Sequence, residues 1–207
     1  MTRAEFVSLE KKLLPALSGF AIKGSLIFVP PVRTLLRGIS FEGSSFDKAS
    51  FYVNFFVMPL FVPTEHLYFN FGNRVRHRKG GDRWSREDPG LVEELGDALK
   101  QQALPFFSRA TDLVSFAELA ASFSSRNPHT PNAIGFALAR AGRGNQAIDV
   151  LDQVLTHLDL SVAWQHTIAD LSRRLKTMLI EDPEKAQGQL ETWENETVRN
   201  LGLEKFR

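Results

Sequence analysis

The fold is decided by two neighbouring stretches, residues 50–58, SFYVNFFVM, and residues 66–77, HLYFNFGNRVRH. Both are rich in Phe, Tyr and Val, which are common in β-strands, and a loop containing Pro59 and Pro63 separates them. Alternate residues of a strand point to opposite faces of the sheet. The stretches therefore predict two strands sharing one apolar face, made by Phe51, Val53, Phe55 and Val57 in the first and by Leu67, Phe69, Phe71 and Val75 in the second.

The opposite face of the same two strands is polar and aromatic. It carries Tyr52 and Asn54 from the first strand and His66, Tyr68, Asn70, Arg74 and Arg76 from the second. Such side chains suit binding, although an ordinary antiparallel sheet also exposes one polar face to water. Phe56 and Met58 share this face, which favours partial cover by a loop, a helix, a second subunit or a ligand. In a covered site, His66 with Tyr68 is a candidate acid–base pair.

The residues before these strands extend the sheet. Thr2 and Glu5 have the spacing of a capping box, and apolar residues at helical spacing follow, so residues 3–18 are expected to form a helix. Residues 20–29 predict a strand that ends at two prolines, and residues 36–42 predict another before a turn at 43–45. The sequence thus predicts an N-terminal helix and a mainly antiparallel sheet of four or five strands.

The second half of the chain has only helical patterns. After a turn at Gly80 and Gly81, Asp88 and Pro89 have the pattern of a helix start, and this helix is expected to end near residue 103, before Pro105. The fold class is therefore α+β, with a sheet domain over residues 1–103 and a helical region over residues 104–207 that can also pack with it as one domain. Further helices are predicted over residues 113–123, 131–141, 146–158, 162–179 and 183–201.

Residues 128–161 have the pattern of a helical repeat. Small and large apolar residues recur in a first helix at Ile134, Gly135 and Leu138 and in a second helix at Ala147, Ile148, Leu151 and Leu155, with Gly142 at the turn between them. The segment resembles one tetratricopeptide repeat, a unit of about 34 residues, with departures at Pro131, Val154 and Asp159. That family holds peptides in a groove of stacked repeats, so a single repeat implies a structural hairpin that supports the neighbouring domain or a dimer contact.

The N-terminal half has a second resemblance. Its FYVNFF segment at residues 51–56 and its LPFF segment at residues 104–107 are similar to bacterial domain families of unknown function. This resemblance implies a protein of bacterial type and no particular activity.

Residues 74–86, RVRHRKGGDRWSR, form a basic segment with a charge of +5. Arginines such as Arg74, Arg76 and Arg78 are able to contact phosphates, and Trp84 could stack on a base, as in proteins that bind single-stranded nucleic acids. The alternative is an edge hairpin kept soluble by its charges. The net charge of only +1 for the whole chain favours that alternative.

The composition excludes several kinds of site. The 207 residues include no Cys, which excludes disulfides, thiolate metal sites and cysteine nucleophiles and fits a reducing compartment. No P-loop, nucleophile elbow, zinc-binding helix or EF-hand is present, and the five histidines lack ligand spacing, so neither a cofactor nor a metal is expected. Without the apolar core of a signal peptide or a run long enough to span a membrane, we expect a cytoplasmic protein with no membrane partner.

These features predict a binding or protein-interaction protein of bacterial type that uses the polar and aromatic sheet face. The favoured partner is another protein or a second copy of the chain, followed by a small molecule, with nucleic acid last. One alternative is an enzyme without a linear motif and with a pocket around His66, and another is nucleic-acid binding through residues 74–86. No catalytic residue is assigned, and the candidate binding residues are Tyr52, Asn54, His66, Tyr68, Asn70, Arg74, Arg76, Arg78 and Trp84.

Overall fold

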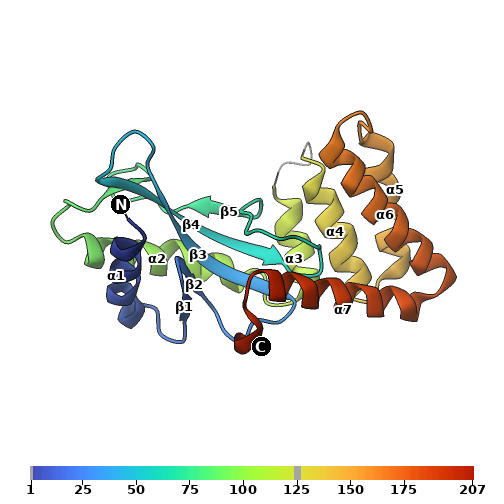
Figure 1. Cartoon of the computed structure of the whole chain (residues 1–207), viewed down its shortest axis with the longest axis horizontal. Helices are drawn as coiled ribbons and strands as arrows, with labels where there is room; N and C mark the ends of the chain where they lie inside the picture. The colour runs from blue at the N-terminus through green and yellow to red at the C-terminus, as the bar shows by residue number, and fades with distance from the viewer. Residues whose placement is uncertain (1, 124–126) are drawn as a thin grey trace.

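The computed structural model of the chain describes residues 2–123 and 127–207 and has the expected α+β architecture (Figure 1). The N-terminal half consists of α1 (Arg3–Leu13), η1 (Leu14–Ala16), β1 (Ala21–Lys23), β2 (Leu26–Phe28), β3 (Leu35–Gly43), β4 (Ser50–Pro59), β5 (Gly72–Arg74), β6 (Arg83–Ser85) and α2 (Leu91–Ser108). The helical half consists of α3 (Leu113–Ala121), α4 (His129–Arg140), α5 (Gly144–His157), α6 (Ala163–Glu181), α7 (Pro183–Asn200) and η2 (Glu204–Phe206).

The strands form one sheet in which every described pair is antiparallel, in the order β1-β2-β3-β4-β5. The β3–β4 hairpin is its centre and pairs along its whole length, from Leu35 opposite Pro59 to Gly43 opposite Phe51. β5 and β6 pair with successive parts of β4. The prediction of an N-terminal helix and a mainly antiparallel sheet is therefore confirmed.

Residues 20–29 form a hairpin, β1–β2, instead of the single strand expected from the sequence. Lys23 lies opposite Leu26, so Gly24 and Ser25 are a two-residue turn. Gly24 has a φ of 62°, which tight hairpin turns require and glycine adopts without strain. Because the turn contributes only these two residues, the apolar pattern of the two strands looks continuous in the sequence.

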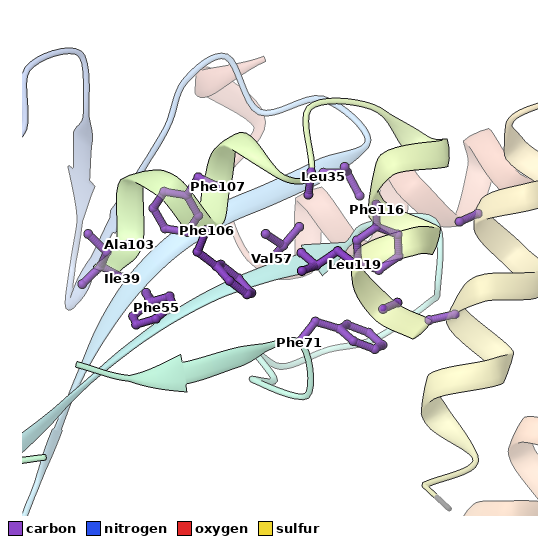
Figure 2. Close-up of a cluster of buried hydrophobic side chains, with 14 of the residues drawn as sticks. Leu35, Ile39, Phe55, Val57, Phe71, Ala103, Phe106, Phe107, Phe116 and Leu119 are labelled. Atoms are coloured by element: carbon purple, nitrogen blue, oxygen red, sulfur yellow. The ribbon is translucent and has the colours of Figure 1, made fainter. Parts of the chain in front are cut away.

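One face of the sheet is covered by α1, α2 and α3. The ring centroids of Phe55 in β4 and Phe106 in α2 lie 5.1 Å apart, and those of Phe6 in α1 and Phe51 in β4 lie 5.9 Å apart. Figure 2 shows this layer, with side chains of α2 and α3 facing those of β3 and β4. The prediction of a buried apolar face on the first strand is confirmed for Phe51, Val53, Phe55 and Val57.

The opposite face of the sheet is covered by the end of the chain. Figure 1 shows α7 running back from the helical half to the sheet, where the C-terminus lies. The rings of Phe28 in β2 and Phe206 in η2 meet edge to face at 4.8 Å. The cover expected from the positions of Phe56 and Met58 is thus confirmed and comes from this chain. The buried residues of this second cluster are Leu26, Phe28, Val32, Leu36, Phe56, Met58, Leu60, Val198 and Leu203.

The predicted strand over residues 66–77 is wrong for its first half, because only residues 72–74 form a strand there. Phe71 packs in the first core as predicted. Leu67 packs against the second cluster, and the ring of Phe69 lies 4.8 Å from that of Phe56, so both are on the opposite side of the sheet from the one predicted. The alternating pattern arises here from a loop whose apolar side chains pack on both faces.

Helix α2 differs from its prediction at both ends. Gly90 is the N-cap, and Asp88 instead accepts a hydrogen bond from the backbone N–H of Ser85 at 3.0 Å, which closes the turn after β6. The helix continues through the exposed Pro105 to Ser108, because Phe106 and the residue after it pack in the core. The predicted domain boundary at residues 103 and 104 therefore falls inside one helix.

The five helices expected in the second half are confirmed to within two residues at each end. α4 and α5 pack against each other, and a Cβ on Gly135 would lie 2.9 Å from Leu151 Cδ2, so glycine permits their close approach.

The buried carboxylate of Glu194 in α7 contacts Arg140 Nε of α4 at 3.5 Å and Arg207 Nη2 at 2.9 Å. This cluster joins α4, α7 and the C-terminal residue.

Candidate functional site

The sequence-predicted site residues do not form one surface. Tyr52 and Arg74 lie together on the sheet, with the guanidinium carbon 4.0 Å from the ring centroid. Arg74 also pairs with Asp82 at 3.2 Å. Asn54 lies opposite Arg74, is buried, and has an Nδ2 without a hydrogen-bond partner. His66 and the two other candidates near it belong to the connection between β4 and β5 instead.

The basic segment lies against an acidic helix. The backbone of Arg76 exchanges hydrogen bonds with the Gln102 side chain of α2, and the Arg78 N–H donates to Glu94 Oε1 at 3.4 Å. Glu93, Glu94 and Asp97 line the same hollow as Arg76 and Arg78, so part of the positive charge is compensated within the protein.

Trp84 belongs to the core. Its side chain is 1% exposed, and its Nε1 donates a hydrogen bond to the Val75 carbonyl at 3.0 Å. The ring is therefore not accessible for stacking on a nucleic-acid base, the role that the sequence suggested for it.

A cavity of about 400 Å³, here called the junction pocket, lies where residues 62–70 meet α4 and α6. Figure 1 shows β4 running toward the helical half, so that the connection after it reaches these helices. The volume falls in the range of small-molecule sites, about 300–1,000 Å³. The lining residues are Val62, Pro63, Thr64, Tyr68, Asn70, His129, Asn132, Ala133, Trp164, Thr167, Ile168 and Leu171.

The loop wall of the pocket is tied to α7. The Thr64 N–H donates to Thr197 Oγ1 at 3.3 Å, and Asn200 Nδ2 donates to the Thr64 carbonyl at 3.1 Å. Tyr68 packs against both hydrophobic clusters. The segment that presents Tyr68 and Asn70 is thus held by the helical half as well as by the sheet.

Several polar groups of the lining make no hydrogen bond to the residues that the structure describes, among them Asn132 Nδ2, the Tyr68 hydroxyl and the Asn70 carboxamide. Asn132 is only 2% exposed, and its Oδ1 accepts from Ser172 Oγ at 2.9 Å, which leaves Nδ2 as an unpaired donor. The Tyr68 hydroxyl and the Asn70 carboxamide also make no hydrogen bond to the part of the protein that the structure describes. Tyr68 and Asn70 are half-buried, and polar groups that line a cavity without a partner in the protein are positions where a ligand can supply one.

Two stacked rings form an aromatic wall of the pocket. The rings of His129 and Trp164 lie 5.3 Å apart with an interplanar angle of 12°. Trp164 is 46% exposed, so part of its ring is accessible to a ligand. Burial lowers the pKa of His129, and its imidazole is therefore neutral at pH 7. A neutral, flat surface of this kind suits stacking by another ring.

The described lining carries no formal charge at pH 7. It contains no Asp, Glu, Lys or Arg. Burial raises the pKa of the Tyr68 hydroxyl far above its usual range, which keeps the phenol protonated and able to donate a hydrogen bond. The pocket therefore offers hydrogen bonds and apolar surface without a counter-charge.

Two larger hollows flank α2, with volumes of about 730 Å³ and 1000 Å³. Several of their polar groups pair within the protein, among them Arg86 Nη1 with Glu5 Oε1 at 2.6 Å and Lys100 with Asp97 at 3.5 Å. Because these groups are already satisfied, the hollows give less reason than the junction pocket to expect a ligand.

The sequence named Tyr68 and Asn70 of this pocket but missed His129, Asn132 and Trp164. The missed residues come from α4 and α6, and no spacing along the chain relates them to the loop after β4. One signal was present, because Asn132 lies on the helix face that buries Gly135, Phe136 and Ala139. A polar residue in an apolar stripe is unusual and needs a hydrogen-bonding reason.

His66 and Tyr68, the candidate acid–base pair, do not both line the junction pocket. His66 is exposed and lies outside the lining of the junction pocket, to which Tyr68 contributes.

No group of three or more metal-ligating side chains occurs in residues 2–123 and 127–207. No helix of these ranges combines the length and apolar character needed to cross a membrane.

Comparison of the chain with protein-family models, curated proteins and solved structures gives no match. The tetratricopeptide-like pattern and the bacterial resemblance of the N-terminal half thus receive no support from known proteins. The functional argument depends on the junction pocket itself.

Proposed function

We propose that the chain is a non-catalytic binding protein that holds a small molecule in the junction pocket. The observation that carries this proposal is the unpaired Nδ2 of the buried Asn132, placed in a cavity with an aromatic wall. Small-molecule sites combine mostly apolar walls with a few polar groups that fix orientation. The Tyr68 hydroxyl and the Asn70 carboxamide, from the loop after β4, supply further groups of this kind.

The pocket favours this function over the other expectations from the sequence. A partner protein through the sheet face is less supported, because the C-terminal segment covers the apolar part of that face. An enzyme centred on His66 draws no support from the junction pocket, because His66 is exposed and does not line it. Nucleic-acid binding is less supported, because Trp84 is buried and the acids Glu93, Glu94 and Asp97 of α2 line the same hollow as Arg76 and Arg78.

Indole is a suitable probe for the proposed site, because it is small, aromatic and uncharged. We expect indole to bind the wild-type chain saturably in saturation-transfer NMR. Thr167→Trp should weaken this binding by about tenfold or more, because Thr167 is an exposed residue of α6 at the pocket lining, where an indole side chain would fill the cavity.

Thr177→Trp is the matched control, because Thr177 is exposed on the same helix but does not line the pocket. The control variant should bind indole as the wild type does. Non-saturable binding to the wild type, or equal binding by the Thr167→Trp variant, would overturn the proposed function.

A further inference from the structure

We infer that the ligand of the junction pocket is an uncharged, planar aromatic molecule carrying an amide-like pair of one hydrogen-bond donor and one acceptor. The inference rests on the proposed function and specifies the chemistry of the same site. It follows from three independent properties of the lining: the absence of charge among its described residues, its aromatic wall, and the types of its unpaired polar groups.

The lack of a counter-charge selects against ions. Transfer of a carboxylate or an ammonium from water into a site without an opposite charge loses solvation that nothing in the site replaces. The described lining consists of apolar, amide, hydroxyl, indole and imidazole side chains only. A neutral ligand avoids this loss and keeps the full gain from burying its apolar surface.

The aromatic wall selects for a flat ring. Trp164 stacks on His129 and remains 46% exposed, so part of its ring is accessible to a ligand. Aromatic groups in contact gain about 0.5–1.5 kcal/mol beyond the burial of their area. Ile168 and Leu171 of the same helix complete an apolar surface next to Trp164.

The unpaired polar groups select for an amide-like edge. Asn132 Nδ2 can only donate, so it needs an acceptor on the ligand. The Asn70 carboxamide can accept a hydrogen bond from the ligand through its oxygen, and the Tyr68 hydroxyl can donate or accept. A carbonyl next to an N–H, as in an aromatic amide or an oxo-heterocycle, satisfies both sides.

Four molecules of nearly identical shape test this chemistry: benzamide, benzoate, benzamidine and α-methylstyrene. They present a neutral amide, an anion, a cation and an apolar group on the same phenyl ring. At pH 7 we expect benzamide to bind most tightly, with each of the other three weaker by about tenfold. Competition against indole in saturation-transfer NMR measures all four at the same site.

Two conservative variants assign the preference to named side chains. Tyr68→Phe keeps the packing and removes one hydroxyl. It should therefore weaken the binding of benzamide by about fivefold and leave the binding of α-methylstyrene unchanged. Asn132→Asp keeps an oxygen that can accept the hydrogen bond from Ser172 and replaces the amide donor by a negative charge. The variant should therefore bind benzamidine more tightly than benzamide. If Asn132→Asp does not fold, Tyr68→Phe alone decides the test.

The outcomes separate this inference from the proposed function. If indole binds and is blocked by Thr167→Trp, but benzoate or benzamidine matches benzamide, the pocket is a binding site and the inferred ligand chemistry is wrong. If Tyr68→Phe weakens benzamide and α-methylstyrene equally, the hydrogen-bond assignment is wrong as well. Absence of indole binding contradicts the proposed function itself.

Discussion

Replacing Glu10 by Gln is expected to raise the free energy of unfolding by about 3 kcal/mol at pH 8. Glu10 is 0% exposed in α1, and both carboxylate oxygens lack a hydrogen-bond partner in the described structure. Burial raises the pKa of this carboxyl from 4.5 to about 7. Gln has the same size and no charge, so it keeps the packing and removes the cost of ionising a buried group.

The pH dependence of this effect has a definite sign. Below pH 4.5 Glu10 is protonated in both the folded and the unfolded chain, and the variant should match the wild type. Between pH 4.5 and about 7 only the unfolded chain ionises readily, so the wild type loses stability as the pH rises. Above this window the loss stays constant.

Urea denaturation of both proteins from pH 4.5 to pH 8 measures this difference. Glu118→Gln is the control, because Glu118 is exposed on α3 and its substitution should change the stability by less than about 0.5 kcal/mol at every pH. A stability difference between wild type and Glu10→Gln that does not vary with pH would show that Glu10 is not a buried, unpaired acid.

Replacing Trp84 by Ala is expected to lower the free energy of unfolding by about 3–5 kcal/mol. The side chain is 1% exposed in the first core, and its Nε1 holds the Val75 carbonyl at 3.0 Å. Removing it leaves a cavity and an unpaired buried carbonyl between β6 and the segment after β5. The expected effect of Trp84→Ala is therefore a loss of folding stability, as for a core residue, and not a loss of nucleic-acid binding.

Trp164→Ala is the natural comparison, because Trp164 is 46% exposed. This variant should lose less than about 1 kcal/mol in the same urea denaturation experiment. Equal losses for the two variants, or a loss below about 1 kcal/mol for Trp84→Ala, would contradict the assignment of Trp84 to the core.

The regular elements were predictable from local patterns. The alternating apolar residues of β4 and the helical spacing of α3 to α7 placed these elements correctly, because burial of one face dictates the residue types along each of them. The capping box at Thr2 and Glu5 is present, with the Glu5 N–H donating to Thr2 Oγ1 at 3.3 Å. Such signals depend only on neighbours in the chain.

The loop after β4 was not predictable in this way. Leu67 and Phe69 alternate with His66, Tyr68 and Asn70 as in a strand. In the structure, Leu67 and Phe69 pack against the second hydrophobic cluster, and Tyr68 lines the junction pocket. Its course depends on α7, which anchors Thr64 from far along the chain. A loop whose apolar side chains pack on two surfaces and a strand in a sheet can have the same alternating sequence.

Only part of the junction pocket was predictable from the sequence, because the pocket also depends on contacts between distant parts of the chain. Tyr68 and Asn70 stood out as polar and aromatic residues near the sheet, whereas His129, Asn132 and Trp164 reach the pocket only through the packing of α4 and α6. Trp84 shows the opposite error, since its basic neighbours suggested a surface role and its indole fills the core. Tertiary contacts, not local composition, decide which aromatic residues are available to a ligand.

The most direct test of the junction pocket is a titration of the ¹⁵N-labelled protein with indole, followed by NMR of side-chain N–H groups. The Trp164 indole and the Asn70 and Asn132 carboxamides should shift together and saturate with one dissociation constant, while buried Trp84 should not move. Shifts that do not saturate, or that centre on Tyr52 and Arg74 of the sheet, would contradict the account.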